Sequence, residues 1–166
     1  MPPHSVFLSY RRADSAGDVR YLYDLLSESL GEGRVFMDVD SISYGEDFVE
    51  VIERTLTGCQ VVLVVIGPSW LSVRDERGRL RLERPGDPVR VEVMAALSMK
   101  VKLIPVLVGG AVMPDEEELP EGLKPLSRRN AFMLSHDKRF KRDVQDLVKE
   151  LRKLLVVEQA AVSVVQ

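Results

Sequence analysis

Hydrophobic and polar positions follow two different periods along this chain. Short runs that are apolar at nearly every position are typical of strands buried on both faces of a parallel sheet. Between them, apolar residues recur every three or four positions, which predicts helices. This alternation predicts an α/β fold with a five-stranded parallel sheet. We expect the strands at Val6–Leu8, Val35–Val39, Val61–Ile66, Leu103–Val108 and Ala131–Leu134.

Four stretches between or after these strands are expected to be helical. Two of them end at a glycine, Gly31 and Gly58, a common residue at a helix end. A third covers Val89–Lys100, and the last follows the fifth strand and has a basic outer face. The apolar stripes that predict the other three helices comprise Val19, Leu22, Leu26 and Leu30; Phe48, Val51, Ile52 and Leu56; and Val144, Leu147, Val148, Leu151, Leu154 and Leu155.

Three stretches depart from this alternation. Arg74–Pro88 is charged and contains glycine and proline, which predicts a mobile loop, either a lid or an insertion. Pro114–Pro120 is acidic and predicts a short helix or turn on the surface. The end of the chain, Val156–Gln166, is rich in valine and alanine. We therefore expect one domain over residues 1–155 and a tail or linker over 156–166.

Composition narrows the class of protein further. The chain has 166 residues, of which 45% are hydrophobic and 30% charged, as in ordinary single globular domains. A net charge of −3 offers no broad surface for nucleic acid. The single cysteine, Cys59, cannot form an internal disulfide and is expected to be a small buried residue. With no secretory signal or long apolar span, we expect a cytoplasmic protein that contacts neither membrane nor nucleic acid.

Two arginines directly follow the first predicted strand. Ligands bind at the carboxyl ends of strands in open α/β sheets, and guanidinium groups grip phosphate well. Arg11 and Arg12 are therefore candidates for contact with an anionic ligand. The alternative is that they form ion pairs with Asp14, Asp38 or Asp40, which would order the site without touching a ligand.

Glu92 is the acidic candidate on the third predicted helix, Val89–Lys100, near its start. A carboxylate in a first helical turn also compensates the helix dipole, so on spacing alone Glu92 has a purely structural alternative. Two aromatic residues have similar alternatives. Tyr10 is expected either to stack on a ligand ring or to cover the edge of the core, and Trp70 either to stack or to pack.

Four segments in the right order resemble the boxes of TIR (Toll/interleukin-1 receptor-like) domains, bacterial type. The first is an apolar strand that ends in Ser9-Tyr10-Arg11-Arg12. The others are Val35–Phe48, Gln60–Leu71 and Asp87–Glu92. The resemblance covers about Ser5 to Leu155. It implies a flavodoxin-like three-layer αβα sandwich.

The resemblance also implies an activity, because the fourth box carries the glutamate of NAD-cleaving TIR domains. Glu92 would contact the ribose beside nicotinamide, NAD⁺ would be substrate rather than cofactor, and no metal is implied. Products would be nicotinamide and either ADP-ribose or a cyclic isomer. Pro88 stands where many NAD-cleaving relatives carry an aromatic residue, for which Trp70 or Tyr44 could substitute. The expected substrate-binding residues are Tyr10, Arg11, Arg12, Asp14, Ser15, Asp38, Asp40, Tyr44 and Trp70.

A second function class stays open. The loop Asp40–Asp47 exposes Ile42 and Tyr44 among acids, and TIR domains associate with one another through this loop. The chain could therefore be a self-associating scaffold, with or without catalysis. Implied partners are further copies, other TIR proteins or a sensor domain beyond Gln166, in antiviral defence or interference with host signalling.

The same residues bear on three other classes of protein. A nucleoside-processing transferase with a glutamate nucleophile is a further alternative. A phosphorylatable receiver domain and a Rossmann dehydrogenase lack their motifs here.

Overall fold

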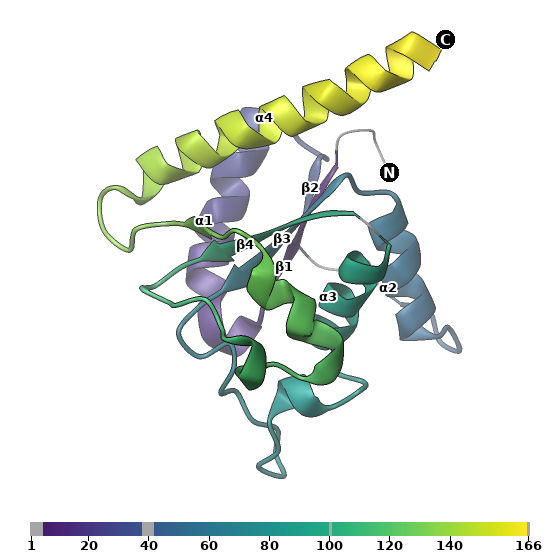
Figure 1. Ribbon diagram of the computed structural model, residues 1–166, viewed down its shortest axis with the longest axis vertical. Helices are drawn as coiled ribbons and strands as arrows, with labels where there is room; N and C mark the ends of the chain where they lie inside the picture. The colour runs from purple at the N-terminus through teal and green to yellow at the C-terminus, as the bar shows by residue number, and fades with distance from the viewer. Residues whose placement is uncertain (1–4, 38–41, 100, 166) are drawn as a thin grey trace.

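The five expected strands pair in parallel into one sheet in the order β2-β1-β3-β4-β5 (Figure 1). This computed structural model describes residues 5–37, 42–99 and 101–165, and for 156–165 the backbone alone. The predicted fold class is confirmed, although the outer strands are shorter than expected. Their bounds are β1 (Val6–Ser9), β2 (Val35–Phe36), β3 (Val61–Ile66), β4 (Lys102–Leu107) and β5 (Phe132–Met133).

The central strands send alternate side chains to two separate cores, as the pleat of a strand requires. Phe7 of β1 faces one core, while its neighbours Val6 and Leu8 face the other. On β3 the same alternation holds, and all six residues are buried. This double burial explains why these strands read as continuous apolar runs rather than as alternating ones.

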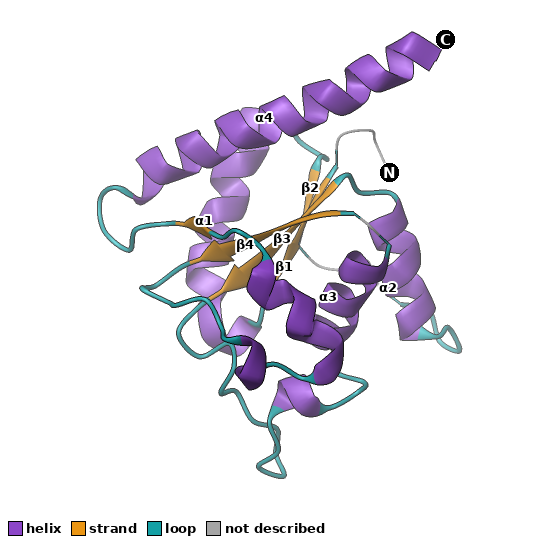
Figure 2. Cartoon of the chain, viewed as in Figure 1, coloured by secondary structure: helices purple, strands orange, loops and turns teal. Residues whose placement is uncertain are grey.

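Two pairs of helices cover the two faces of the sheet (Figures 1 and 2). Helices α1 (Arg12–Leu30) and α4 (Phe140–Val165) lie on one face, and α2 (Phe48–Thr57) and α3 (Pro88–Ser98) lie on the other. The backbone of α4 continues through residues 156–165, which we expected to form a tail or linker. None of the helices in the described ranges is long and apolar enough to cross a membrane.

The charged segment before α3, expected to be a mobile loop, folds into a hairpin over residues 74–80. An antiparallel bridge joins Arg74 to Leu80, and the Asp75 carboxylate accepts the backbone N–H groups of Arg77 and Arg79, each at 2.9 Å. A 3₁₀ helix, η1 (Arg81–Glu83), follows and buries Leu82. The segment is thus anchored at both its tip and its base.

The connection between β4 and β5 consists of two 3₁₀ helices, η2 (Glu116–Glu118) and η3 (Glu121–Arg128). The first confirms the short surface helix predicted from the acidic segment. Its start is held by a capping box, in which the Asp115 backbone N–H donates to the Glu118 carboxylate at 3.0 Å. The second, η3, packs against α3 and so supports the helix that carries Glu92.

Cys59 is buried in the short connection between α2 and β3, as its sequence position predicted. Burial raises the pKa of its thiol to about 11, because the apolar surroundings disfavour the thiolate. The thiol therefore stays protonated near neutral pH and acts as a small core residue.

Candidate functional site

A pocket of about 410 Å³ opens beside the carboxyl end of β1, between α2 and α3. This is the edge of the sheet at which ligands of open α/β proteins bind. Most of its walls are apolar, with a carboxylate and three guanidinium groups at its border. The lining residues are Tyr10, Arg11, Arg12, Met37, Ile42, Phe48, Ile52, Arg81, Pro88, Val89 and Glu92.

Glu92 supplies the carboxylate of this pocket and is 8% exposed. The Ser9 hydroxyl, at the end of β1, donates a hydrogen bond to Glu92 Oε1 at 3.4 Å. Because α3 begins at Pro88, its first turn contains no acid and Glu92 belongs to the second turn. Compensation of the helix dipole falls off beyond the first turn, so that structural alternative loses its basis.

Arg11 forms its ion pair with Asp87, whereas the sequence suggested Asp14, Asp38 or Asp40 as partners. Its two terminal nitrogens donate to the two Asp87 carboxylate oxygens at 2.8 and 2.6 Å, and both side chains are 2% exposed. Asp87 also caps α3, since it accepts the Arg90 backbone N–H at 3.1 Å. The pair therefore ties the end of β1 to the start of the helix that carries Glu92.

The predicted ligand residues divide between the pocket and other places. Tyr10, Arg11 and Arg12 border the pocket together with Glu92. Tyr44 is fully exposed on its loop. Asp38 and Asp40 lie outside the described residues.

Three other candidates lie in or beside the core rather than among the residues that line the pocket. Trp70 is 1% exposed and belongs to the core beneath α2 and α3. Ser15 is buried at a kink in α1. Asp14 accepts the backbone N–H groups of Gly67 at 2.8 Å and Ser69 at 2.7 Å, so it fixes the exit of β3.

The environment of Asp14 shifts its ionisation. Burial raises the pKa of this carboxyl, and the two backbone donors together with the charge of Arg11 partly offset that rise. The carboxylate is therefore occupied by hydrogen bonds to the backbone. It lies so close to Gly67, the residue that follows β3, that no side chain fits there unless Asp14 moves.

Replacing Gly67 by alanine is expected to destabilise the fold by about 1–3 kcal/mol, the usual cost of overpacking. A Cβ atom there would lie 2.6 Å from each Asp14 carboxylate oxygen, so Asp14 would have to leave its two backbone donors. Gly17→Ala is the matched control, because its Cβ meets nothing within 4 Å and a helical glycine favours alanine by about 0.5–1 kcal/mol. Urea unfolding of both variants measures the difference. Equal stabilities would contradict the expected clash.

Several residues that line or support the pocket were missed from the sequence. Asp87 had a detectable signal, because an aspartate before a proline and an apolar run is typical of a helix start. Phe48 and Ile52 were recognised only as members of an apolar stripe. Nothing in the sequence distinguishes Arg81 from the four other arginines of residues 74–84. In the described ranges, no three His, Cys, Asp or Glu side chains are grouped so as to hold a metal ion.

Comparison with protein families identifies this chain as similar to a known family. The model of the TIR domain family matches residues 6–154. A comparison with curated proteins finds no match.

Solved structures similar to this fold include two with TIR domains. The TIR domains of the activated Roq1 resistosome, which recognises the pathogen effector XopQ, superpose with a TM-score of 0.61 at 14% identity, over 89% of this chain and 98% of that one. A TIR-STING receptor from C. gigas, solved with 2',3'-cGAMP, gives a TM-score of 0.55 at 19% identity. There the match covers 89% of this chain but 41% of the receptor. At these identities the likeness concerns the fold.

Proposed function

Because this chain belongs to the TIR domain family, we propose that it is an NAD⁺ glycohydrolase that cleaves the bond between nicotinamide and ribose. The observation that carries the proposal is the position of Glu92. Its carboxylate is almost fully buried, and it borders a pocket at the ligand-binding edge of the sheet. Burying a carboxylate costs free energy, and an acid retained at such a place is typical of a functional site.

The proposed reaction requires little besides this carboxylate. The glycosidic bond breaks with its electron pair going to the pyridinium nitrogen, so nicotinamide leaves neutral and the ribose becomes an oxocarbenium ion. The Glu92 carboxylate stabilises that developing positive charge. Water then adds to the ribose and loses a proton, which gives ADP-ribose, nicotinamide and H⁺. Attack by the substrate's own adenine instead of water would give a cyclic isomer.

The pocket walls suit a flat aromatic leaving group. Phe48 and Tyr10 both border the pocket, and so does Pro88, which stands where many NAD-cleaving relatives carry an aromatic residue. We propose that Phe48, contributed by α2, supplies the aromatic surface that Trp70 and Tyr44 were expected to offer. Ile52 and Val89 complete an apolar wall that keeps water from the nicotinamide ring.

Nicotinamide release tests the proposal directly. Purified protein is incubated with NAD⁺, and nicotinamide, ADP-ribose and cyclic products are quantified by chromatography. A glycohydrolase or cyclase releases one nicotinamide for each NAD⁺ consumed. Absence of NAD⁺ loss at every protein concentration would overturn the assignment.

A second candidate function, self-association, is favoured by the loop before α2. Tyr44 is fully exposed and Ile42 is 42% exposed, so the loop presents apolar surface that the domain itself does not cover. Ile42 also lines the pocket. A neighbouring copy that docks on this loop would therefore act on the pocket wall as well, which couples assembly to catalysis.

This coupling predicts that activity per molecule rises with protein concentration in the wild type. Tyr44→Asp places a charge in an apolar contact between copies. The variant is therefore expected to form smaller assemblies in sedimentation measurements and to show a smaller rise of specific activity with protein concentration. Val112→Asp is the control, as Val112 is 83% exposed and lies between β4 and η2. Specific activity that is constant across concentrations would contradict the coupling.

A further inference from the structure

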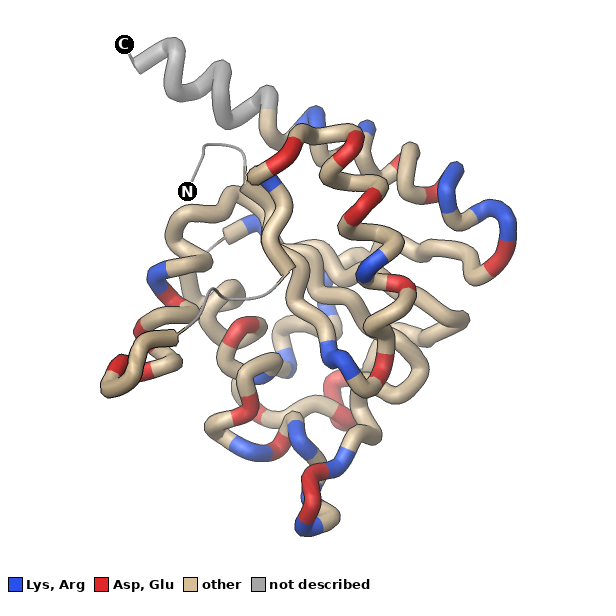
Figure 3. The backbone as a smooth tube through the Cα atoms, turned by 180° about the vertical axis from the view of Figure 1, so that it is seen from behind, with Lys and Arg blue, Asp and Glu red and all other residues tan. Residues whose placement is uncertain are grey.

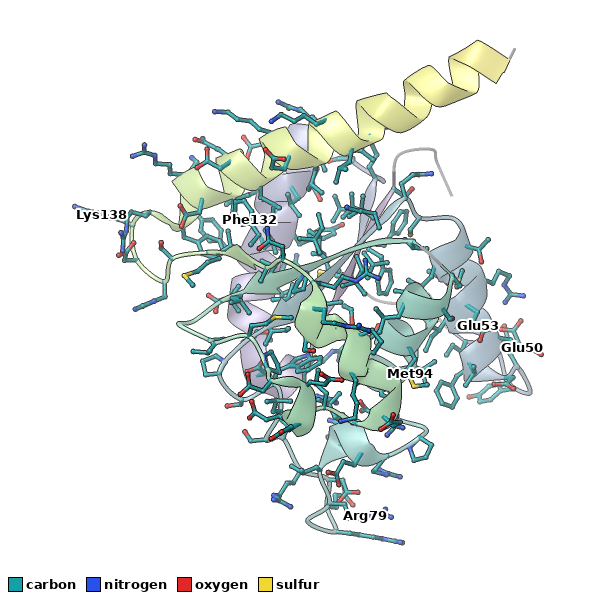
Figure 4. The ribbon with its side chains drawn as sticks, in the orientation of Figure 1. Glu50, Glu53, Arg79, Met94, Phe132 and Lys138 are labelled. Carbon is teal, nitrogen blue, oxygen red and sulfur yellow. The ribbon has the colours of Figure 1, made fainter. Side chains whose placement is uncertain are left out.

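A second cavity, of about 520 Å³, adjoins the first and has a different chemistry. We call it the arginine groove. It lies along the hairpin of residues 74–80 and the turn that follows, at the end of the molecule where Figure 4 labels Arg79. Arg81 lines this groove and the Glu92 pocket alike, so the two cavities meet at one side chain. The groove is lined by Arg74, Asp75, Glu76, Arg77, Arg79, Arg81 and Arg84.

The charge of the groove is only partly balanced within the protein. Residues 74–84 contain five arginines and three acids, and Figure 3 shows blue and red interspersed along this projecting segment. Asp75 is the acid most engaged, at 3.2 Å from Arg79 Nε and 3.4 Å from an Arg84 terminal nitrogen. Its Oδ1 also accepts the backbone N–H groups of Arg77 and Arg79. One carboxylate thus serves several donors at once.

Arg77 has no such counter-charge. Within the described part of the chain, no side chain forms an ion pair or hydrogen bond with its guanidinium group. Arg81 is also incompletely paired, since its Nε lies 3.8 Å from an Asp87 oxygen that already accepts from Arg11, and the side chain is 40% exposed. Guanidinium groups gathered at this density repel one another and attract an anion.

We infer that the arginine groove binds the diphosphate of the dinucleotide whose nicotinamide occupies the Glu92 pocket. This inference rests on the proposed function. In NAD⁺ the diphosphate is joined to the nicotinamide ribose through its 5′ carbon, so its site must adjoin the site of bond cleavage. Arg81 stands at that junction, and planar guanidinium groups bind phosphate oxygens in pairs.

Arg11 is not needed for this task, because its guanidinium is buried and its terminal nitrogens are both bound to Asp87. The phosphate-binding role expected for Arg11 therefore passes to arginines that lie about 70 residues further along the chain. The groove's polar walls also suit phosphate better than an adenine ring, which prefers apolar or aromatic surface.

The first test compares two substrates that share the scissile bond, NAD⁺ and nicotinamide riboside, which has no phosphate. In the double variant Arg77→Gln/Arg84→Gln, kcat/KM for NAD⁺ is expected to fall about tenfold or more relative to kcat/KM for the riboside, since each charged hydrogen bond contributes a tenfold factor or more. The control is Arg20→Gln/Arg142→Gln, which removes the same charge from exposed sites on α1 and α4. A proportional change for both substrates would overturn the inference.

The second test measures binding without catalysis, with ADP as the probe. Calorimetric titration is expected to show ADP binding that weakens at least tenfold in the groove variant and that weakens with salt in the wild type. Thermal melts establish that both variants are folded. Equal ADP affinity in the wild type and the groove variant overturns the inference that the arginine groove binds diphosphate. If the wild type cleaves neither substrate, the proposed glycohydrolase activity is wrong. ADP binding that depends on Arg77 and Arg84 would still support diphosphate binding in the groove.

Discussion

Glu92→Gln is expected to lower kcat for NAD⁺ cleavage by about 10²–10³-fold, the usual effect of removing one preorganised group that stabilises transition-state charge. Glutamine keeps the size of the side chain and can still accept the Ser9 hydroxyl, so the pocket should keep its shape. What is lost is the negative charge opposite the oxocarbenium ion. Because that charge develops only as the bond breaks, KM for NAD⁺ should change much less than kcat.

The matched control is Glu50→Gln, which removes one negative charge from the exposed side of α2. Figure 4 shows Glu50 and Glu53 projecting from that helix. The control should retain wild-type turnover, and both variants should melt within a few degrees of the wild type. Turnover by Glu92→Gln that equals that of the control would exclude Glu92 as the catalytic carboxylate.

Asp87→Ala is expected to destabilise the domain by about 3–5 kcal/mol, the usual cost of breaking a buried ion pair from one side. The substitution leaves the Arg11 guanidinium buried without its counter-charge, at 2% exposure. It also removes the cap that accepts the Arg90 backbone N–H, a smaller loss of about 1 kcal/mol. The free energy of unfolding in urea measures the sum.

The double variant Arg11→Met/Asp87→Ala separates these contributions. It is expected to recover much of the lost stability, since no unpaired charge remains in the core. Activity should stay low in the double variant, because the pair is what anchors the start of α3, and with it Glu92, to the end of β1. Losses of stability that simply add up across the two single variants would contradict a coupled pair.

Much of the fold could be predicted because its signals are local. The apolar runs of β1 and β3 and the stripes of α1, α2 and α4 depend on residues a few positions apart. The outer strands β2 and β5 are two residues each, shorter than their apolar runs, because each pairs on one side only. The start of α3 was misplaced by one residue, although Pro88 and the Asp87 cap were visible.

The candidate site was predictable in part for a related reason. Parallel strands bring their carboxyl ends to one edge, so Tyr10, Arg11 and Arg12 were expected there on topology. Whether a particular side chain then enters the pocket or the core is decided by packing. Trp70 follows β3 and Asp14 lies at the start of α1, so both were as well placed to reach the pocket. The structure instead buries Trp70 in the core and binds Asp14 to the backbone at the exit of β3.

The sequence by itself determined the order of strands and helices along the chain and the family motifs, since both depend on residue types over short spacings. Glu92 was singled out by the resemblance that these motifs carry. Only the tertiary structure decided that Arg11 pairs with Asp87, that Phe48 faces the same pocket as Glu92, and that Arg81 joins that pocket to the arginine groove. Arg11 and Asp87 are 76 positions apart. No local period carries information over that separation, because such contacts form only when the helices pack against the sheet.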